Sequence, residues 1–242
     1  MTTTPIIDIR RADERDHTRA GWLDSWHSFS FGSHYSPTNT NHGQLIVLND
    51  DRVAGGTGFD THPHRDMEII TWVLDGELEH KDSEGNEGVI YPGLAQRMSA
   101  GRGIWHSEKN HSPTDEVHFV QMWIVPDTAS IDPGYEQRDV NDQLAAGGLV
   151  PVASGQGHDG AISIHQKDAT MWVGRLAADE EVALPTAPFA HLFVARGQAE
   201  IDDGDSLGTG DAVRITDGGS LRLTAGPEGA EVILWTTGAL AR

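Results

Sequence analysis

The pattern of apolar and polar positions along the chain is that of short β-strands. Residues 69–74 form a run of apolar and β-branched side chains, and residues 77–81 alternate between polar and apolar. Polar and glycine residues at 82–86 separate these segments from a second apolar segment at 89–91, which ends at a Pro-Gly pair. Apolar runs of this length, bounded by turn residues, indicate antiparallel strands that wind into a small barrel.

Three further segments fit the same architecture. Residues 6–9 and 43–49 are apolar runs with the length of a strand, and residues 117–125 form an apolar stretch that ends at a proline. The absence of alternation in this last segment predicts a strand buried on both faces. His118 and Gln121 lie on it with opposite parity, so that only one of them can face the barrel interior.

The second half of the chain repeats the plan of the first in shorter form. Between residues 127 and 160 the composition shifts to Pro, Gly, Asp, Ser and Ala, which is typical of a connector. Beyond it, residues 197–211 repeat the strand and turn order of residues 76–93. The predicted division is an N-terminal metal-binding domain at 1–130, a connector at 131–160 and a degenerate C-terminal domain at 161–242.

Charge and composition exclude several classes of partner. The chain has 37 acidic and 17 basic residues, a formal net charge of −20, which opposes direct binding to nucleic acid or to anionic lipid. The absence of cysteine excludes disulfides, thiolate metal ligands and a cysteine nucleophile. No apolar stretch approaches the roughly 18 residues of a membrane span, and no N-terminal run resembles a signal peptide. We therefore expect a cytoplasmic protein.

The candidate chemistry lies in two pairs of residues. His62 and His64 are two positions apart on one predicted strand, and His106 and Glu108 are two apart on another. Because the side-chain period of a strand is two, each pair points to one face, and two facing pairs offer four metal ligands. Three imidazoles and one carboxylate with open coordination positions favour a divalent first-row metal over calcium or magnesium.

The other histidines lack such a pattern. At the position that corresponds to the His-Pro-His segment, the second half of the chain has residues 182–186 (VALPT), which include no histidine. The C-terminal barrel is therefore predicted to lack metal. A lone imidazole rarely makes a metal site, and the remaining histidines are expected in packed, loop or exposed strand positions. Among them are His17, His27, His34, His42, His80, His111, His165 and His191.

Several segments together resemble a known family. Gly56, the histidine pair at 62–64, Glu68 and Gly76 together resemble the first cupin motif. Residues 88–93 with His106 and Asn110 resemble the second. More narrowly, the chain resembles bacterial pirin-like proteins over about its first 140 residues. The resemblance rests on residues 22–31 (WLDSWHSFSF), 62–68 (HPHRDME), 98–108 (MSAGRGIWHSE), 121–124 (QMWI) and 135–138 (YEQR).

The resemblance implies a fold, a cofactor and an activity. The fold is all-β and bicupin, with two consecutive antiparallel jelly-roll barrels. In pirin-like proteins the residues that match His62, His64, His106 and Glu108 bind one divalent metal ion, iron(II) first, with manganese, nickel, copper, cobalt or zinc as alternatives. Several resemble quercetin 2,3-dioxygenase and cleave a flavonol with O2, releasing carbon monoxide. Glu108 would then be the catalytic base for the 3-hydroxyl of this small aromatic substrate.

Three questions stay open from the sequence. Pirins are also known as iron-dependent, redox-sensing regulators, so the alternative function is binding of a transcription factor or a metabolic enzyme. A metal-dependent isomerase of the cupin superfamily is a third reading. Glu68 has the parity of His62 and His64, and it is either a further ligand or a residue that supports the ligands or forms an ion pair.

Overall fold

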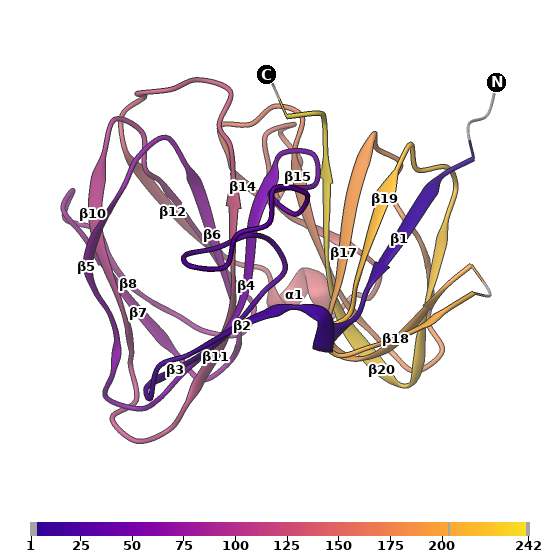
Figure 1. The fold of residues 1–242 in the computed structure, drawn as a ribbon, viewed down its shortest axis with the longest axis horizontal. Helices are drawn as coiled ribbons and strands as arrows, with labels where there is room; N and C mark the ends of the chain where they lie inside the picture. The colour runs from indigo at the N-terminus through magenta and orange to yellow at the C-terminus, as the bar shows by residue number, and fades with distance from the viewer. Residues whose placement is uncertain (1–3, 203, 241–242) are drawn as a thin grey trace.

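Strand pairing organises the described residues, 4–202 and 204–240 of the computed structural model, into two lobes placed side by side (Figure 1). The strands of the first lobe are β2 (Asp16–Arg19), β3 (Leu23–His27), β4 (Leu45–Val53), β5 (Gly58–His64), β6 (Glu68–Asp75), β7 (Leu78–Asp82), β8 (Glu87–Ile90), β9 (Leu94–Ser99), β10 (Ile104–Asn110), β11 (Val117–Ile124) and β12 (Gly134–Asp139). They form a four-stranded sheet, β5-β10-β7-β8, and a seven-stranded sheet, β12-β9-β6-β11-β4-β3-β2.

The second lobe is one nine-stranded sheet. Its strands are β1 (Ile6–Arg10), β13 (Val150–Ser154), β14 (Ile162–Ser163), β15 (Thr170–Leu176), β16 (Glu181–Ala183), β17 (Phe189–Ile201), β18 (Ser206–Gly208), β19 (Ala212–Thr216) and β20 (Arg222–Thr237). The described helices are the short α1 (Asn141–Leu144) and the single 3-10 turn at Ala12–Glu14. Neither of these described helices is long and apolar enough to span a membrane. The predicted all-β bicupin fold is confirmed.

Strand pairing departs from the predicted domain division in two places. β1, which the division assigns to the N-terminal domain, pairs with β19 at the edge of the C-terminal sheet. β12, which falls within the predicted connector, pairs with β9 of the first lobe. Both segments complete an edge by adding a strand to it, and a sheet edge offers unpaired backbone groups to whichever segment can reach it. The amino-acid composition of a segment does not indicate which sheet edge the segment will join.

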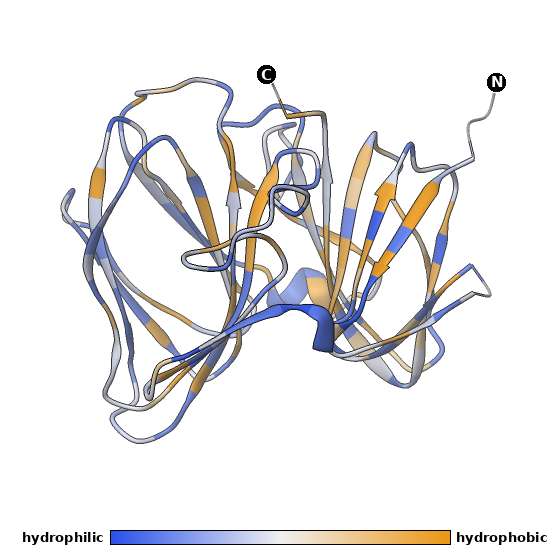
Figure 2. Cartoon of the chain, in the orientation of Figure 1, coloured by the Kyte–Doolittle hydropathy of each residue, from blue (hydrophilic) through white to orange (hydrophobic). Residues whose placement is uncertain are grey.

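The largest apolar cluster joins the two lobes. One face of the seven-stranded sheet contributes Ile70 and Trp72, and the second lobe contributes Phe193 and Trp235, all at most 1% exposed. The opposite face of the same sheet packs Val73 into the interior of the first lobe. β6 is therefore buried on both faces, which explains its apolar run without alternation. Apolar segments lie mostly on strands, whereas the connecting loops are mostly hydrophilic (Figure 2).

Polar contacts also cross between the lobes. Trp72 Nε1 on β6 donates to Glu231 Oε1 on β20 at 2.8 Å. Arg175 Nε on β15 lies 3.6 Å from the other carboxylate oxygen of Glu231. A buried carboxylate needs such partners, because an unpaired buried charge is strongly destabilising. The first lobe is therefore backed by a second one through both apolar and polar contacts.

Replacing Trp235 with alanine is expected to lower the free energy of unfolding by about 3–5 kcal/mol, because a fully buried indole is deleted from the shared core. Urea denaturation followed by circular dichroism measures the change. Trp105, which is 53% exposed, is the matched control, and its replacement with alanine should change stability by no more than about 0.5 kcal/mol. Equal losses in the two variants would contradict a shared core at Trp235.

Candidate metal centre

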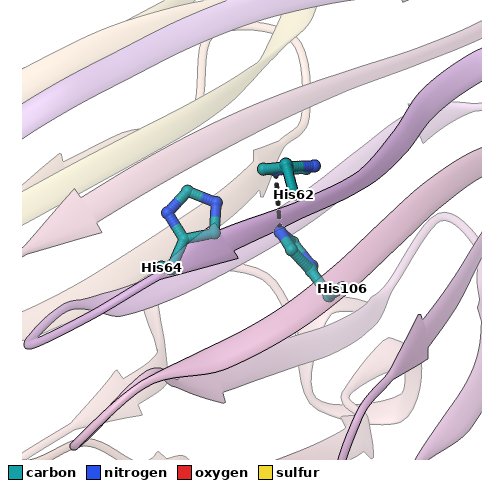
Figure 3. A group of neighbouring side chains, drawn as sticks. All are labelled: His62, His64 and His106. Carbon is teal, nitrogen blue, oxygen red and sulfur yellow. Dashed lines mark hydrogen bonds between the residues drawn. The ribbon is translucent and has the colours of Figure 1, made fainter.

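The predicted metal ligands lie on two neighbouring strands of the four-stranded sheet. In the β5–β10 pair, His106 lies opposite His62. A β-bulge between His106 and Glu108 shifts the register, so that Glu108 lies opposite Phe59. His62 and His64 are two residues apart on β5, and both rings meet His106 from the next strand (Figure 3).

The three imidazoles are close enough to share one ion. The Nε2 atoms of His62 and His106 are 3.1 Å apart. The ring centroid of His64 lies 4.8 Å from that of His62 and 4.9 Å from that of His106. One nitrogen from each ring lies within 4.8 Å of the other two. The structure therefore brings together the three histidines that the strand parity predicted.

The hydrogen bonds of these rings favour a cation between them. His62 Nδ1 donates to the backbone oxygen of Asp60 at 2.7 Å, which leaves its Nε2 unprotonated in the neutral ring. His64 Nε2 is buried and has no hydrogen-bond partner among the described residues. Two nitrogen ligands bound at right angles, each about 2.1 Å from a metal ion, lie about 3 Å apart. The three-imidazole set thus fits a divalent first-row metal.

The protonation state of the rings also suits a metal. Burial, and next the adjacent imidazoles of His106 and His62, lower the pKa of His64 to about 4. Burial, with His62 and His80 as further causes, lowers the pKa of His106 to about 3. Both rings are therefore neutral at pH 7, and a histidine must be neutral to bind a metal ion.

Glu108 is held from the opposite sheet of the barrel. Gln121 Nε2 on β11 donates to Glu108 Oε1 at 3.0 Å and to Oε2 at 2.8 Å. Trp123 Nε1 donates to Gln121 Oε1 at 3.1 Å, which orients the amide group. Of His118 and Gln121, which have opposite parity on β11, Gln121 is therefore the one whose side chain reaches the interior, whereas His118 contacts Asp50. Sequence parity left this choice open, and the contacts decide it.

A second group of candidate ligands shares His106. Its members are His80, His106 and Glu108, and all three are buried. The prediction that His80 occupies an exposed loop or strand position is wrong, because its side chain is fully buried beside His106. Its parity with Leu78, which is also fully buried, was the signal available in the sequence.

Two other expectations from the sequence are resolved by contacts. His27, which was placed in or beside a loop, lies on β3, and its Nδ1 is 2.8 Å from Asn49 Oδ1 inside the lobe. Glu68 belongs to neither group of candidate ligands. It accepts from Ser99 Oγ at 2.9 Å and from the backbone N of His165 at 3.1 Å. Its Oε1 also lies 3.4 Å from His165 Nδ1, so of the alternatives for Glu68 its contacts favour the ion pair.

A pocket opens next to the histidines and Glu108. Its volume is about 430 Å³, within the usual range for small-molecule sites. Four aromatic side chains contribute to its walls, and such faces pack well against a flat aromatic ligand. They are Trp22, Phe31, Phe59 and Trp123. The pocket therefore combines candidate metal ligands with a surface suited to an aromatic molecule.

Comparison with known proteins assigns the family. Residues 9–124 match the family described as Pirin, and residues 151–235 match the quercetinase C-terminal cupin domain. The chain is 54% identical over 233 residues to a Mycobacterium tuberculosis protein, covering 96% of this chain and 95% of the relative. The chain belongs to the pirin family. The relative is provisionally named a quercetin 2,3-dioxygenase.

This pirin is also similar to a further named protein and to solved structures. The chain is 40% identical over 232 residues to a protein of Escherichia coli named quercetin 2,3-dioxygenase, covering 95% of this chain and 98% of the relative. The crystal structure of YhhW from Escherichia coli matches with a TM-score of 0.91 at 39% identity, covering 98% of this chain and 100% of that one. A structure described as bacterial pirin YhhW in complex with nickel(II) matches with a TM-score of 0.89 at 39% identity, covering 97% and 100% of the two chains.

Asp51 is an unusual acidic residue inside the first lobe of this pirin. It lies on β4 and is 3% exposed. Burial raises the pKa of its carboxyl to about 8, and the charges of Asp50 and Glu108 add to this effect, while a hydrogen bond with Ser25 opposes it. Because the unfolded pKa is about 3.9, the native state binds this proton more tightly than the unfolded chain does. Stability from this group is present at acid pH and is lost as the pH rises from about 4 to about 8.

Replacing Asp51 with asparagine is therefore expected to stabilise the metal-free protein at pH 9 by roughly 3–5 kcal/mol relative to wild type, with a much smaller gain at pH 5. Urea denaturation at both pH values in the presence of a chelator measures the difference. The exposed Asp13 gives the control, because its replacement with asparagine should leave the pH dependence unchanged. An equal effect of the Asp51 variant at pH 5 and pH 9 would mean that Asp51 titrates normally.

Proposed function

We propose that this pirin binds one divalent metal ion through His62, His64, His106 and Glu108. The 3.1 Å approach of two Nε2 atoms and the unpartnered Nε2 of His64 are the observations that support it most directly. We propose iron(II) as the native metal, with manganese, nickel, copper, cobalt or zinc as alternatives that the same donor set accepts. The structure of bacterial pirin YhhW from Escherichia coli in complex with nickel(II) supports metal binding by this family.

The proposed reaction is the cleavage of quercetin, or a related flavonol or aromatic enol, by O2 with release of carbon monoxide. Two features support it: the names of the relatives and the aromatic walls of the pocket over the histidines. When bound, the metal ion supplies a Lewis acid for a substrate oxygen and a redox centre for dioxygen. The protein's own part is to bind, orient and deprotonate the substrate.

The pocket residues would perform these tasks as follows. Trp123 and Phe59 pack against the flat substrate and exclude water from its reacting edge. Glu108 accepts the proton of the substrate's 3-hydroxyl, because it is the buried one of the two carboxylates that line the pocket, whereas Asp60 is exposed and pairs with Lys109. Gln121 restrains Glu108 through both carboxylate oxygens, so that the base is held in one orientation before substrate arrives.

Replacing His62 with alanine is expected to remove stoichiometric metal from the purified protein, as measured by elemental analysis. Wild type reconstituted anaerobically with iron(II) should then consume O2 when quercetin is added, and the His62 variant should not. His111, a partly exposed histidine outside the site, is the control, and its replacement with alanine should leave both metal and O2 uptake intact. Metal binding without O2 uptake on any flavonol would favour the regulatory function, and turnover without O2 would favour an isomerase.

Replacing Glu108 with glutamine tests the base separately from the metal. The three histidines remain, so we expect metal to stay bound more weakly, while kcat/KM for quercetin falls by roughly 100- to 10,000-fold, the usual contribution of a general base. The same change at Glu116, whose side chain is half exposed, is the control. Full turnover by a metal-loaded Glu108 variant would reject this residue as the base.

A further inference from the structure

A line of buried side chains runs away from the candidate metal centre behind His106. His80 Nδ1 lies 3.5 Å from His106 Nδ1, and His80 Nε2 lies 3.2 Å from Asp82 Oδ2. His80 and Asp82 have fully buried side chains, and His106 is 2% exposed. The line therefore runs Asp82, His80, His106, and it ends at the Nε2 atom that faces His62.

The carboxylate of Asp82 is fixed by the turn that begins with it. Its Oδ1 accepts from the backbone N of Glu84 and the backbone N of Asn86, each at 3.0 Å. Asn86 Nδ2 donates to Oδ2 at 2.9 Å. An ionised carboxylate only accepts hydrogen bonds, so the proton between Asp82 and His80 belongs to His80 Nε2.

The position of that proton determines the next one. A neutral His80 that carries its proton on Nε2 has a lone pair on Nδ1. The contact between His80 Nδ1 and His106 Nδ1 is then a hydrogen bond only if His106 donates. His106 protonated on Nδ1 has its own lone pair on Nε2, where the candidate metal ion would bind.

We propose that Asp82 and His80 are positioning residues that set the tautomer and the ring orientation of the metal ligand His106. This inference rests on the proposed metal site. Tyr135 supports the arrangement, because its ring stacks on His80 with centroids 4.9 Å apart and an interplanar angle of 27°. Residues that hydrogen-bond a metal-binding histidine commonly contribute 10- to 100-fold to metal affinity.

The same residues allow His80 to be read as a ligand, since it groups with His106 and Glu108. Its contacts oppose that reading. Asp82 engages Nε2 and His106 engages Nδ1, so neither nitrogen of His80 has a free lone pair. His64 Nε2, by contrast, has no partner among the described residues.

Wild-type protein without metal provides the first test. The ¹⁵N chemical shifts of a histidine ring report which nitrogen is protonated, and His106 is expected as the Nδ1-protonated tautomer. This readout needs neither metal nor a folded variant. The competing tautomer, protonated on Nε2, would donate to His62 Nε2 at 3.1 Å instead. A His106 ring in that state, or an even mixture of the two tautomers, would overturn the proposal.

Two variants of His80 provide the second test, with nickel(II) affinity measured by competition with a chelator. His80→Asn places an amide oxygen near the position of Nδ1 and keeps an acceptor for His106. His80→Gln places its amide near the position of Nε2, next to Asp82, and removes that acceptor. We expect the glutamine variant to bind nickel(II) about 10- to 100-fold more weakly than wild type and to contain mixed His106 tautomers, whereas the asparagine variant keeps both properties.

The possible outcomes separate the proposals. Equal affinity in both variants and wild type would reject the positioning role, and so would an equal loss in both, which a merely structural role predicts. Loss of all nickel(II) from both variants, as in His62→Ala, would make His80 a ligand. If wild type binds no nickel(II) or iron(II) while His106 has the expected tautomer, the proposed metal function fails but the hydrogen-bonded line stands.

Discussion

Two imidazole nitrogens that face each other at 3.1 Å are the constraint on which the centre of this pirin depends. His62 is fixed by its bond to the backbone oxygen of Asp60, and His106 by its contact with His80. Two imidazole nitrogens at that distance can share one proton as a hydrogen bond or hold one cation between their lone pairs, and the second arrangement is the one that we propose. The neutral state of the buried rings is the state that metal binding requires.

The surrounding fold keeps these rings in place through layered packing. The four-stranded sheet carries the histidines, and the seven-stranded sheet faces it with Gln121 and Trp123. The second lobe closes the outer face of that seven-stranded sheet through Trp72 and Trp235. Sites on strands hold their geometry better than sites on loops. The lobe without the candidate ligands thus contributes stiffness to the lobe that has them.

The interior of the first lobe contains several ionisable side chains. Glu108, Asp51, His80 and Asp82 all lie buried within it. Burying each of these groups costs free energy unless the group is paired or uncharged. Glu108 and Asp82 accept hydrogen bonds, and burial raises the pKa of Asp51, which favours its neutral form. Proteins retain such costs where chemistry needs them, which agrees with a reactive centre in this lobe.

The sequence by itself determined the strands, the barrel plan and the facing parity of His62, His64, His106 and Glu108, because a strand has a strict period of two. The tertiary structure decided what that period leaves open. Which interior residue contacts Glu108, where β1 finds its partner and whether His80 is buried all depend on contacts between segments far apart in the chain. The parity of His80 with Leu78 indicated the face to which His80 points, but it did not show that a polar side chain on that face would find a partner on a neighbouring strand, as His80 does in His106. Local pattern therefore predicted the candidate ligands, and only long-range packing placed the residues around them.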